Sequence, residues 1–195
     1  MPSALRARLK DVLMNPVPAS IEELLGLAIR HVNAGQRERA RKLCEQAVAT
    51  LAPHPAVQQL LAVISLQEGD AAAAVRHAAA SLALRPGHAP TVRVAADAWF
   101  QCALARHEAG DPAGEAQALR EVLRHDPERV EAEVNLGIAL QDAGDIDAAM
   151  QAYGRAYRAR EDTFGRIAHA LSAANVGRLW LDLGELRLAL RNAVG

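Results

Sequence analysis

Apolar residues recur along the chain with the three- and four-residue spacing of amphipathic helices, and short breaks separate these stretches. Four of the breaks share one pattern, a glycine followed by a polar residue: Gly35-Gln36, Gly69-Asp70, Gly110-Asp111 and Gly144-Asp145. A glycine commonly ends a helix, and an aspartate commonly caps the start of the next one. The pattern therefore predicts four tight turns, each of which joins two helices.

Small residues recur at fixed positions around these turns. The step from Gly35 to Gly69 equals the step from Gly110 to Gly144, and only the step between these two pairs is longer. Upstream of each glycine, at a near-constant distance, a small residue follows a leucine or a cysteine: Leu27-Ala28, Leu61-Ala62, Cys102-Ala103 and Leu136-Gly137. Alanine also recurs at one position downstream of three of the glycines, as Ala40, Ala74 and Ala149. Because small residues let antiparallel helices approach closely, the pattern predicts a repeated helix–helix seam.

In these residues the chain resembles the tetratricopeptide repeat (TPR) family, whose repeat is a helix–turn–helix with the same spacing as these glycine pairs. Residues 130–163 fit the motif best, with Leu136-Gly137, Gly144-Asp145, Ala149, Tyr153 and Ala156 at motif positions. Residues 21–54 and 55–88 fit it well, and residues 96–129 fit it less well. The resemblance implies an all-α fold, a right-handed superhelical stack of helix–turn–helix repeats, or TPR-like α-solenoid.

Three segments follow from this pattern. We expect an amphipathic helix and linker in residues 1–19, four TPR-like hairpins in residues 20–161, and a capping helix and tail helix in residues 162–195. Ser20-x-x-Glu23 forms a capping box before the first hairpin. No helix breaker follows Pro90, which predicts a longer first helix, about 90–109, in the third hairpin.

The third hairpin departs from the motif at two positions. Arg106 stands where a large apolar residue is usual, and Glu115 where alanine is usual. A single buried charge is costly. We therefore expect these two side chains to pair with each other across the hairpin.

The N-terminal segment carries an apolar stripe formed by Leu5, Leu9, Val12 and Leu13. This helix could pack on the body of the protein or lie on a membrane surface. Arg6, Arg8 and Lys10 interrupt the segment, so it has no apolar core of the length that a secretion signal needs. No stretch of the sequence is long and apolar enough to predict a membrane span.

The C-terminal segment carries two further apolar patterns. A helix of about 163–174 is expected to cap the last repeat, and Asp182-x-x-Glu185 opens a final helix that runs to about Asn192. The apolar side chains of this tail are Trp180, Leu183, Leu186 and Leu190. They could pack on the protein's own body, or they could dock on a partner or on a second copy as a homo-oligomer.

Composition narrows the classes of partner. The 195 residues are 51% hydrophobic, 3% aromatic and 23% charged, with a net charge of −1. A chain this apolar is not disordered, and its charge gives no overall attraction to nucleic acid or to an anionic membrane. The two cysteines, Cys44 and Cys102, fall on predicted packing positions, which favours buried thiols and a cytoplasmic location.

The sequence shows no pattern typical of an enzyme. None of the seven histidines lies three or four residues from another histidine or from a cysteine, so no local metal site is predicted. A nucleophile elbow and a glycine-rich phosphate loop are both absent from the sequence. We therefore expect no catalytic residues, no metal and no cofactor.

The resemblance implies a concave groove lined by the first helix of each repeat. The residues at groove positions are Leu25, Ile29, Gln59, Val63, Leu66, Asp97, Phe100, Gln101, Leu104, Glu108, Glu131, Val134, Asn135, Ile138 and Asp142. Asn135 matches a position that often hydrogen-bonds a bound peptide backbone in the family, and Gln101 is its weaker counterpart. This groove is apolar toward its N-terminal end and acidic toward its C-terminal end.

The second helices are expected to face outward and to be rich in arginine, with Arg39, Arg76, Arg120, Arg124, Arg155 and Arg158. An acidic groove end favours a ligand with a basic segment, although acids such as Glu131 could also serve only to solvate the surface. The prediction is a protein-binding scaffold or adaptor that recognises a peptide or helix. The alternatives are a self-assembly module that uses the C-terminal tail, a non-catalytic accessory subunit of an enzyme, and, least favoured, a small enzyme.

Overall fold

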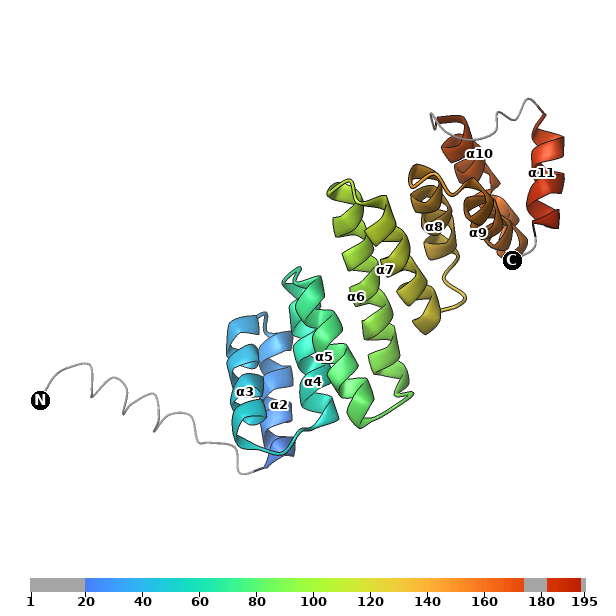
Figure 1. Ribbon diagram of the computed structural model, residues 1–195. Helices are drawn as coiled ribbons and strands as arrows, with labels where there is room; N and C mark the ends of the chain where they lie inside the picture. The colour runs from blue at the N-terminus through green and yellow to red at the C-terminus, as the bar shows by residue number, and fades with distance from the viewer. Residues whose placement is uncertain (1–19, 174–181, 194–195) are drawn as a thin grey trace, which may run out of the picture.

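Helical hairpins follow one another along the computed structural model, which describes residues 20–173 and 182–193 (Figure 1). The four hairpins are α2 (Ile21–Asn33) with α3 (Arg37–Thr50), α4 (Pro55–Gln67) with α5 (Ala71–Leu84), α6 (Ala89–Glu108) with α7 (Pro112–His125), and α8 (Val130–Asp142) with α9 (Ile146–Ala159). They form an elongated stack, and the described residues contain no strand. The predicted all-α solenoid is confirmed. The proposed helix within residues 1–19 lies outside the described residues.

The turn within each hairpin has the chemistry that its sequence predicts. Gly35, Gly69, Gly110 and Gly144 all have positive φ, between 66° and 86°, which other residues rarely adopt. In the last three hairpins the following aspartate caps the second helix. Its side chain accepts hydrogen bonds from backbone N–H groups at 2.8 Å (Asp70 to Ala73), 2.9 Å (Asp111 to Gly114) and 3.2 Å (Asp145 to Ala148). Gln36 makes no such cap.

Small residues form the seam between the two helices of a hairpin. Ala28 and Ala40 in the first hairpin, and Ala62 and Ala74 in the second, have no exposed surface. In the fourth hairpin Gly137 faces the fully buried ring of Tyr153 so closely that a Cβ atom at 137 would lie 2.3 Å from Cε1 of the ring. The repeated spacing in the sequence thus corresponds to the closest approach of the helices.

The third hairpin confirms one expectation and corrects another. Helix α6 has 20 residues, as the absence of a breaker after Pro90 predicts. The predicted Arg106–Glu115 pair is wrong, because the exposed Arg106 reaches the capping Asp111 instead, with Nη1 2.8 Å from Oδ2. The buried Glu115 lies 3.0 Å from Nδ1 of His107, the side chain that faces it across the seam. Burial raises the pKa of Glu115, and the His107 contact opposes that shift.

The end of the chain closes the stack. A short 3₁₀ turn, η1 (Glu161–Thr163), leads into α10 (Phe164–Ala173), and the final helix is α11 (Leu183–Asn192). Helix α11 packs against α9, where its Leu186 and Leu190 are buried, whereas Leu183 is 53% exposed. The fourth apolar residue predicted for the tail, Trp180, lies outside the described residues.

Arg158 of α9 fixes the end of α11. Its Nη1 donates to the carbonyl oxygens of Leu190 at 3.1 Å, Arg191 at 3.4 Å and Ala193 at 2.5 Å. Gly154 makes room for this contact, because a Cβ atom there would lie 2.8 Å from the Leu190 oxygen. Helix α11 therefore packs on its own chain, and Leu186 and Leu190 can meet another molecule only if it detaches.

Candidate partner-binding groove

The predicted groove residues lie on the first helix of each hairpin, α2, α4, α6 and α8. We call the side of the stack formed by these helices and by α10 the groove face. Contacts join α2 to α4, α4 to α6, and α8 to α10. The predicted residues with exposed side chains are Ile29, Asp97, Gln101, Leu104, Glu108, Glu131 and Asp142. Those with half-buried side chains are Leu25, Gln59, Val63, Leu66, Phe100, Asn135 and Ile138.

Val134 is the exception in this set. Its side chain is fully buried in the cluster that surrounds Tyr153 and Ile167. The prediction that it lines the groove therefore fails, because a side chain with no exposed surface cannot contact a ligand. The other predicted groove residues are all exposed or half-buried, and they recur every three or four residues along their helices.

Accessible apolar side chains lie on the groove helices of the first three hairpins. Ile29 on α2 is 47% exposed, and Leu104 on α6 is 44% exposed. Leu25 packs on the core cluster that the first hairpin shares with α4, and Val63 and Leu66 on α4 stay half-buried. Accessible apolar side chains of this kind can bury the apolar side chains of a partner.

The middle of the groove face contains an arginine that the sequence pattern did not single out. Nη1 of Arg129 lies 2.8 Å from Oδ1 of Asp97, and its guanidinium stacks 4.2 Å from the centre of the Phe100 ring. Asp97 is thus already paired within the chain. The negative charge predicted for this part of the groove is correspondingly smaller, and the charge available to a ligand comes from the other acids.

At the C-terminal end, α10 continues the groove face beyond the fourth hairpin. Nη2 of Arg166 on α10 donates to Oδ1 of Asn135 on α8 at 3.0 Å. Asn135 is half-buried, and its amide oxygen already has a donor. Its amide nitrogen is the group that a bound backbone carbonyl could use.

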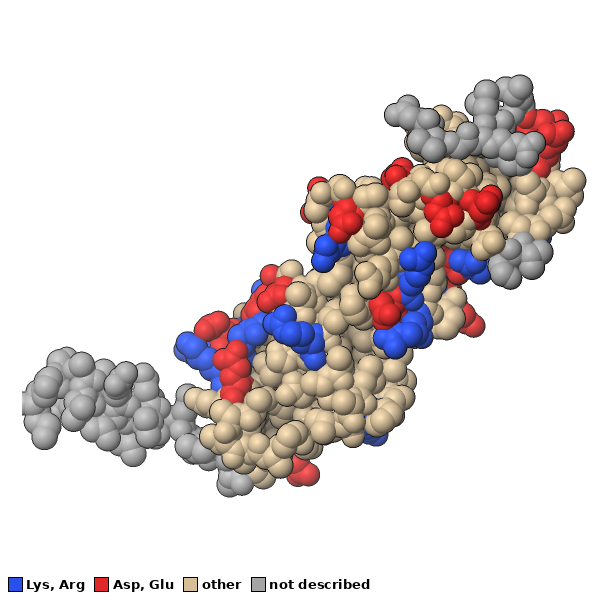
Figure 2. Space-filling model, in the orientation of Figure 1, with Lys and Arg blue, Asp and Glu red and all other residues tan. Residues whose placement is uncertain are grey.

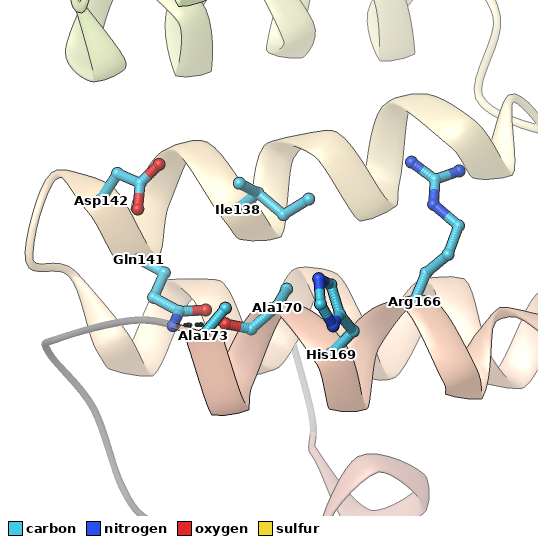
Figure 3. Close-up of a pocket in the computed structure, with 7 residues that line it drawn as sticks. All are labelled: Ile138, Gln141, Asp142, Arg166, His169, Ala170 and Ala173. Atoms are coloured by element: carbon cyan, nitrogen blue, oxygen red, sulfur yellow. Dashed lines mark hydrogen bonds between the residues drawn. The ribbon is translucent and has the colours of Figure 1, made fainter.

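A pocket of about 290 Å³ lies between α8 and α10 (Figure 3). Its lining residues are Ile138, Gln141, Asp142, Arg166, His169, Ala170 and Ala173. In Figure 3 Ile138 and the two alanines form its apolar middle, with Asp142 toward one end and Arg166 toward the other. Gln141 is engaged, since its Nε2 donates to the Ala170 oxygen at 3.3 Å and its Oε1 accepts from Tyr153. The pocket has room for one side chain of a partner.

The sequence pattern missed Arg129, Arg166 and His169 as groove-face residues. The sequence did contain a signal for Arg166 and His169, which lie on α10. Phe164 at the start of α10 lies one repeat length after Val130 at the start of α8. By the same spacing, His169 corresponds to Asn135. Reading α10 as the first helix of a fifth, divergent repeat would have extended the groove to these residues.

Burial makes the two cysteine thiols weak nucleophiles, because it disfavours their thiolate forms. Cys44 is fully buried, and burial raises the pKa of its thiol to about 11. Burial also raises the pKa of the half-buried Cys102. Residues 20–173 and 182–193 contain no cluster of three or more histidine, cysteine, aspartate or glutamate side chains that could hold a metal ion. In the same ranges no helix is long and apolar enough to cross a membrane.

Comparison with two solved MamA structures agrees with this architecture. A crystal structure of MamA protein has a TM-score of 0.53 and 19% identity, over 91% of this chain and 87% of that one. The MamA RS-1 ArsTM double mutant has a TM-score of 0.58 and 14% identity, over 91% and 96%. TTC0263, a thermophilic TPR protein of Thermus thermophilus, gives a TM-score of 0.42 and 16% identity, over 88% of each chain. No family model and no curated protein matches the sequence.

Identities this low establish the fold and nothing further. The hairpins, their turns and the MamA likeness define the class: an all-α helical repeat protein with a TPR-like fold.

Proposed function

We propose that the protein is a binding scaffold that holds a segment of another protein on its groove face. The observation that carries the proposal is the accessible apolar row of α2, α4 and α6, which leads to the Asn135–Arg166 pair and to the pocket beside it. Apolar contacts would supply most of the affinity, and the amide of Asn135 would orient the bound backbone. Function on this account is recognition without a chemical step.

The exposed acids of the groove face that form no ion pair with another described residue favour a ligand with a basic segment. Glu108 and Asp142 stand at the C-terminal ends of the groove helices α6 and α8, and both are exposed. Glu131 is exposed at the start of α8. Figure 2 shows several carboxylates near the upper edge of the stack, and acidic and basic side chains interspersed over the rest of this face. Glu108 and Asp142 support a ligand whose positive charge follows the edge where the hairpins turn, and Glu131 offers a further acid at the opposite end of α8.

Two exposed leucines provide a matched test of the binding face. Leu104 on α6 and Leu84 on α5 are both 44% exposed, but only Leu104 belongs to the groove face. We expect Leu104→Glu and Asn135→Ala to lose the proteins that the wild type recovers from an extract, and Leu84→Glu to keep them. Equal recovery by Leu104→Glu and Leu84→Glu, with both variants folded by circular dichroism, would defeat the proposal.

The basic segment has its own test. The Glu108→Gln, Asp142→Asn double variant should bind the recovered partner more weakly and with a smaller dependence on salt, because fewer charges attract it. An unchanged salt dependence would refute the basic segment of the ligand, but it would not contradict binding on the groove face. Self-assembly through Leu186 and Leu190 finds no support in this structure, since both are buried on the chain's own α9.

A further inference from the structure

The two ends of the described stack differ in how they are covered. At the C-terminal end, α11 lays Leu186 and Leu190 on α9 and leaves neither exposed. At the N-terminal end, the last residues of α3 and the loop after it leave Val48 47% exposed and Leu51 43% exposed. Terminal repeats of a solenoid need a covering element, because the last hairpin has no neighbour to bury its apolar side chains.

An apolar hollow at the base of the first hairpin, where α4 of the second hairpin begins, contains both residues. Ile21 of α2, the end of α3, the loop after α3 and the start of α4 line it, with Ala47, Val48, Leu51, Ala52, His54 and Val57. Nδ1 of His54 is buried at the hollow without a hydrogen-bond partner among the described residues. The hollow is therefore a small apolar surface with an unsatisfied polar atom at its edge.

We propose that residues 1–19 of the same chain cover this hollow. Leu5, Leu9, Val12 and Leu13 share one face of a helix, and Leu5 and Leu9 have the same four-residue spacing as Leu186 and Leu190 of α11. The segment would then lay its apolar face on the first hairpin and on the start of α4.

The length of the connection permits this arrangement. Ile21 lines the hollow itself, so the chain that precedes it begins at the hollow's edge. Residues 14–19 can span at most about 20 Å, which allows a helix ending near Leu13 to fold back onto α3. The connection contains Pro16 and Pro18, and because proline interrupts a helix, the sequence does not predict one continuous helix from Leu13 into α2.

Charge also favours a contact within the chain. The segment contains Arg6, Arg8 and Lys10 against a single acid, Asp11. Glu22 is exposed in the first turn of α2, next to the hollow. A basic segment laid beside α2 therefore meets a carboxylate of opposite sign, which adds a small favourable term at low salt.

The test compares two aspartate substitutions in the full-length chain by hydrogen–deuterium exchange. Leu9→Asp places a charge on the apolar face, and Ala7→Asp places the same charge on the opposite face of the same helix. We expect amide exchange across residues 47–57 to quicken on the order of tenfold in Leu9→Asp and to stay at the wild-type rate in Ala7→Asp.

Three outcomes would overturn the proposal. Equal exchange in both variants and in the wild type would show that the segment does not cover the hollow. A difference that grows with protein concentration would assign the cover to a second copy. Protection of residues 47–57 that appears only with added anionic phospholipid vesicles would assign the segment to a membrane surface.

Discussion

Gly137 gives the sharpest test of why small residues recur at the seam. In most helix interiors, replacing glycine by alanine stabilises a protein by about 1 kcal/mol, because alanine has the higher helix propensity. At Gly137 the added Cβ would lie 2.3 Å from Cε1 and 2.4 Å from Cδ1 of Tyr153. The Tyr153 side chain is fully buried, so its ring has no open solvent into which it could move.

The size of the effect follows from these contacts. Overpacking of a rigid core costs about 1–3 kcal/mol. A displaced Tyr153 ring would also strain the hydrogen bond from its hydroxyl to Oε1 of Gln141, 2.8 Å long, and a bond of this kind contributes about 1 kcal/mol. After subtraction of the propensity gain, Gly137→Ala should destabilise the protein by about 2 kcal/mol. For a chain of this size that lowers Tm by about 4–8 °C.

Gly165 provides the matched control. It also lies within a helix, α10, but no atom approaches within 4 Å of a Cβ built on it. Gly165→Ala should therefore leave stability unchanged or raise it by up to about 1 kcal/mol. In a Tyr153→Leu background, Gly137→Ala should become nearly neutral, because the atoms it strikes are gone. Thermal and urea unfolding of all four variants measure these differences, and a Gly137→Ala protein as stable as the wild type would refute the seam argument.

The remaining predictions concern the tail helix, the buried Glu115 and the two cysteines. Arg158→Ala removes the donor to three carbonyl groups at the end of α11, so amide exchange in residues 183–192 should quicken on the order of tenfold, whereas Arg120→Ala on α7 should leave it unchanged. Because burial raises the pKa of folded Glu115 above the ordinary 4.5, its ionisation opposes folding, and the stability advantage of Glu115→Gln should grow as pH rises from about 4.5; an advantage that shrinks would contradict this sign. At pH 8 Ellman's reagent should label Cys102 before Cys44, whose pKa is about 11, and unfolding in urea should abolish the difference; faster labelling of Cys44 would contradict its burial.

The fold was predictable because its signals are local. A glycine with positive φ and an aspartate cap need only a few neighbouring residues, so Gly69-Asp70 and Gly144-Asp145 specify their turns directly. The seam positions recur in step with these turns, and each repeat supports the others. Even the longer α6 followed from one local fact, the absence of a breaker after Pro90.

Side-chain partners were harder to predict, because they depend on which of several groups a long side chain meets. Arg106 could reach Glu115 or Asp111, and exposure decides for Asp111, where the pair stays in water. Val134 sits at a groove position in the repeat, yet its side chain is buried in the core cluster that contains Tyr153 and Ile167. Arg166 reaches the groove face because α10 takes the place of a fifth first helix, which only the spacing from Val130 to Phe164 indicates in the sequence.

The most direct test of the central claim is the location of the bound partner. A photo-crosslinking residue at Ile29 or Leu104 would stand on the groove face, and the same residue at Leu84 would stand on a second helix with the exposure of Leu104. The account predicts that the partner recovered from an extract crosslinks at the two groove positions and not at Leu84. Crosslinking at Leu84 alone, or equally at all three positions, would contradict a binding site on the groove face.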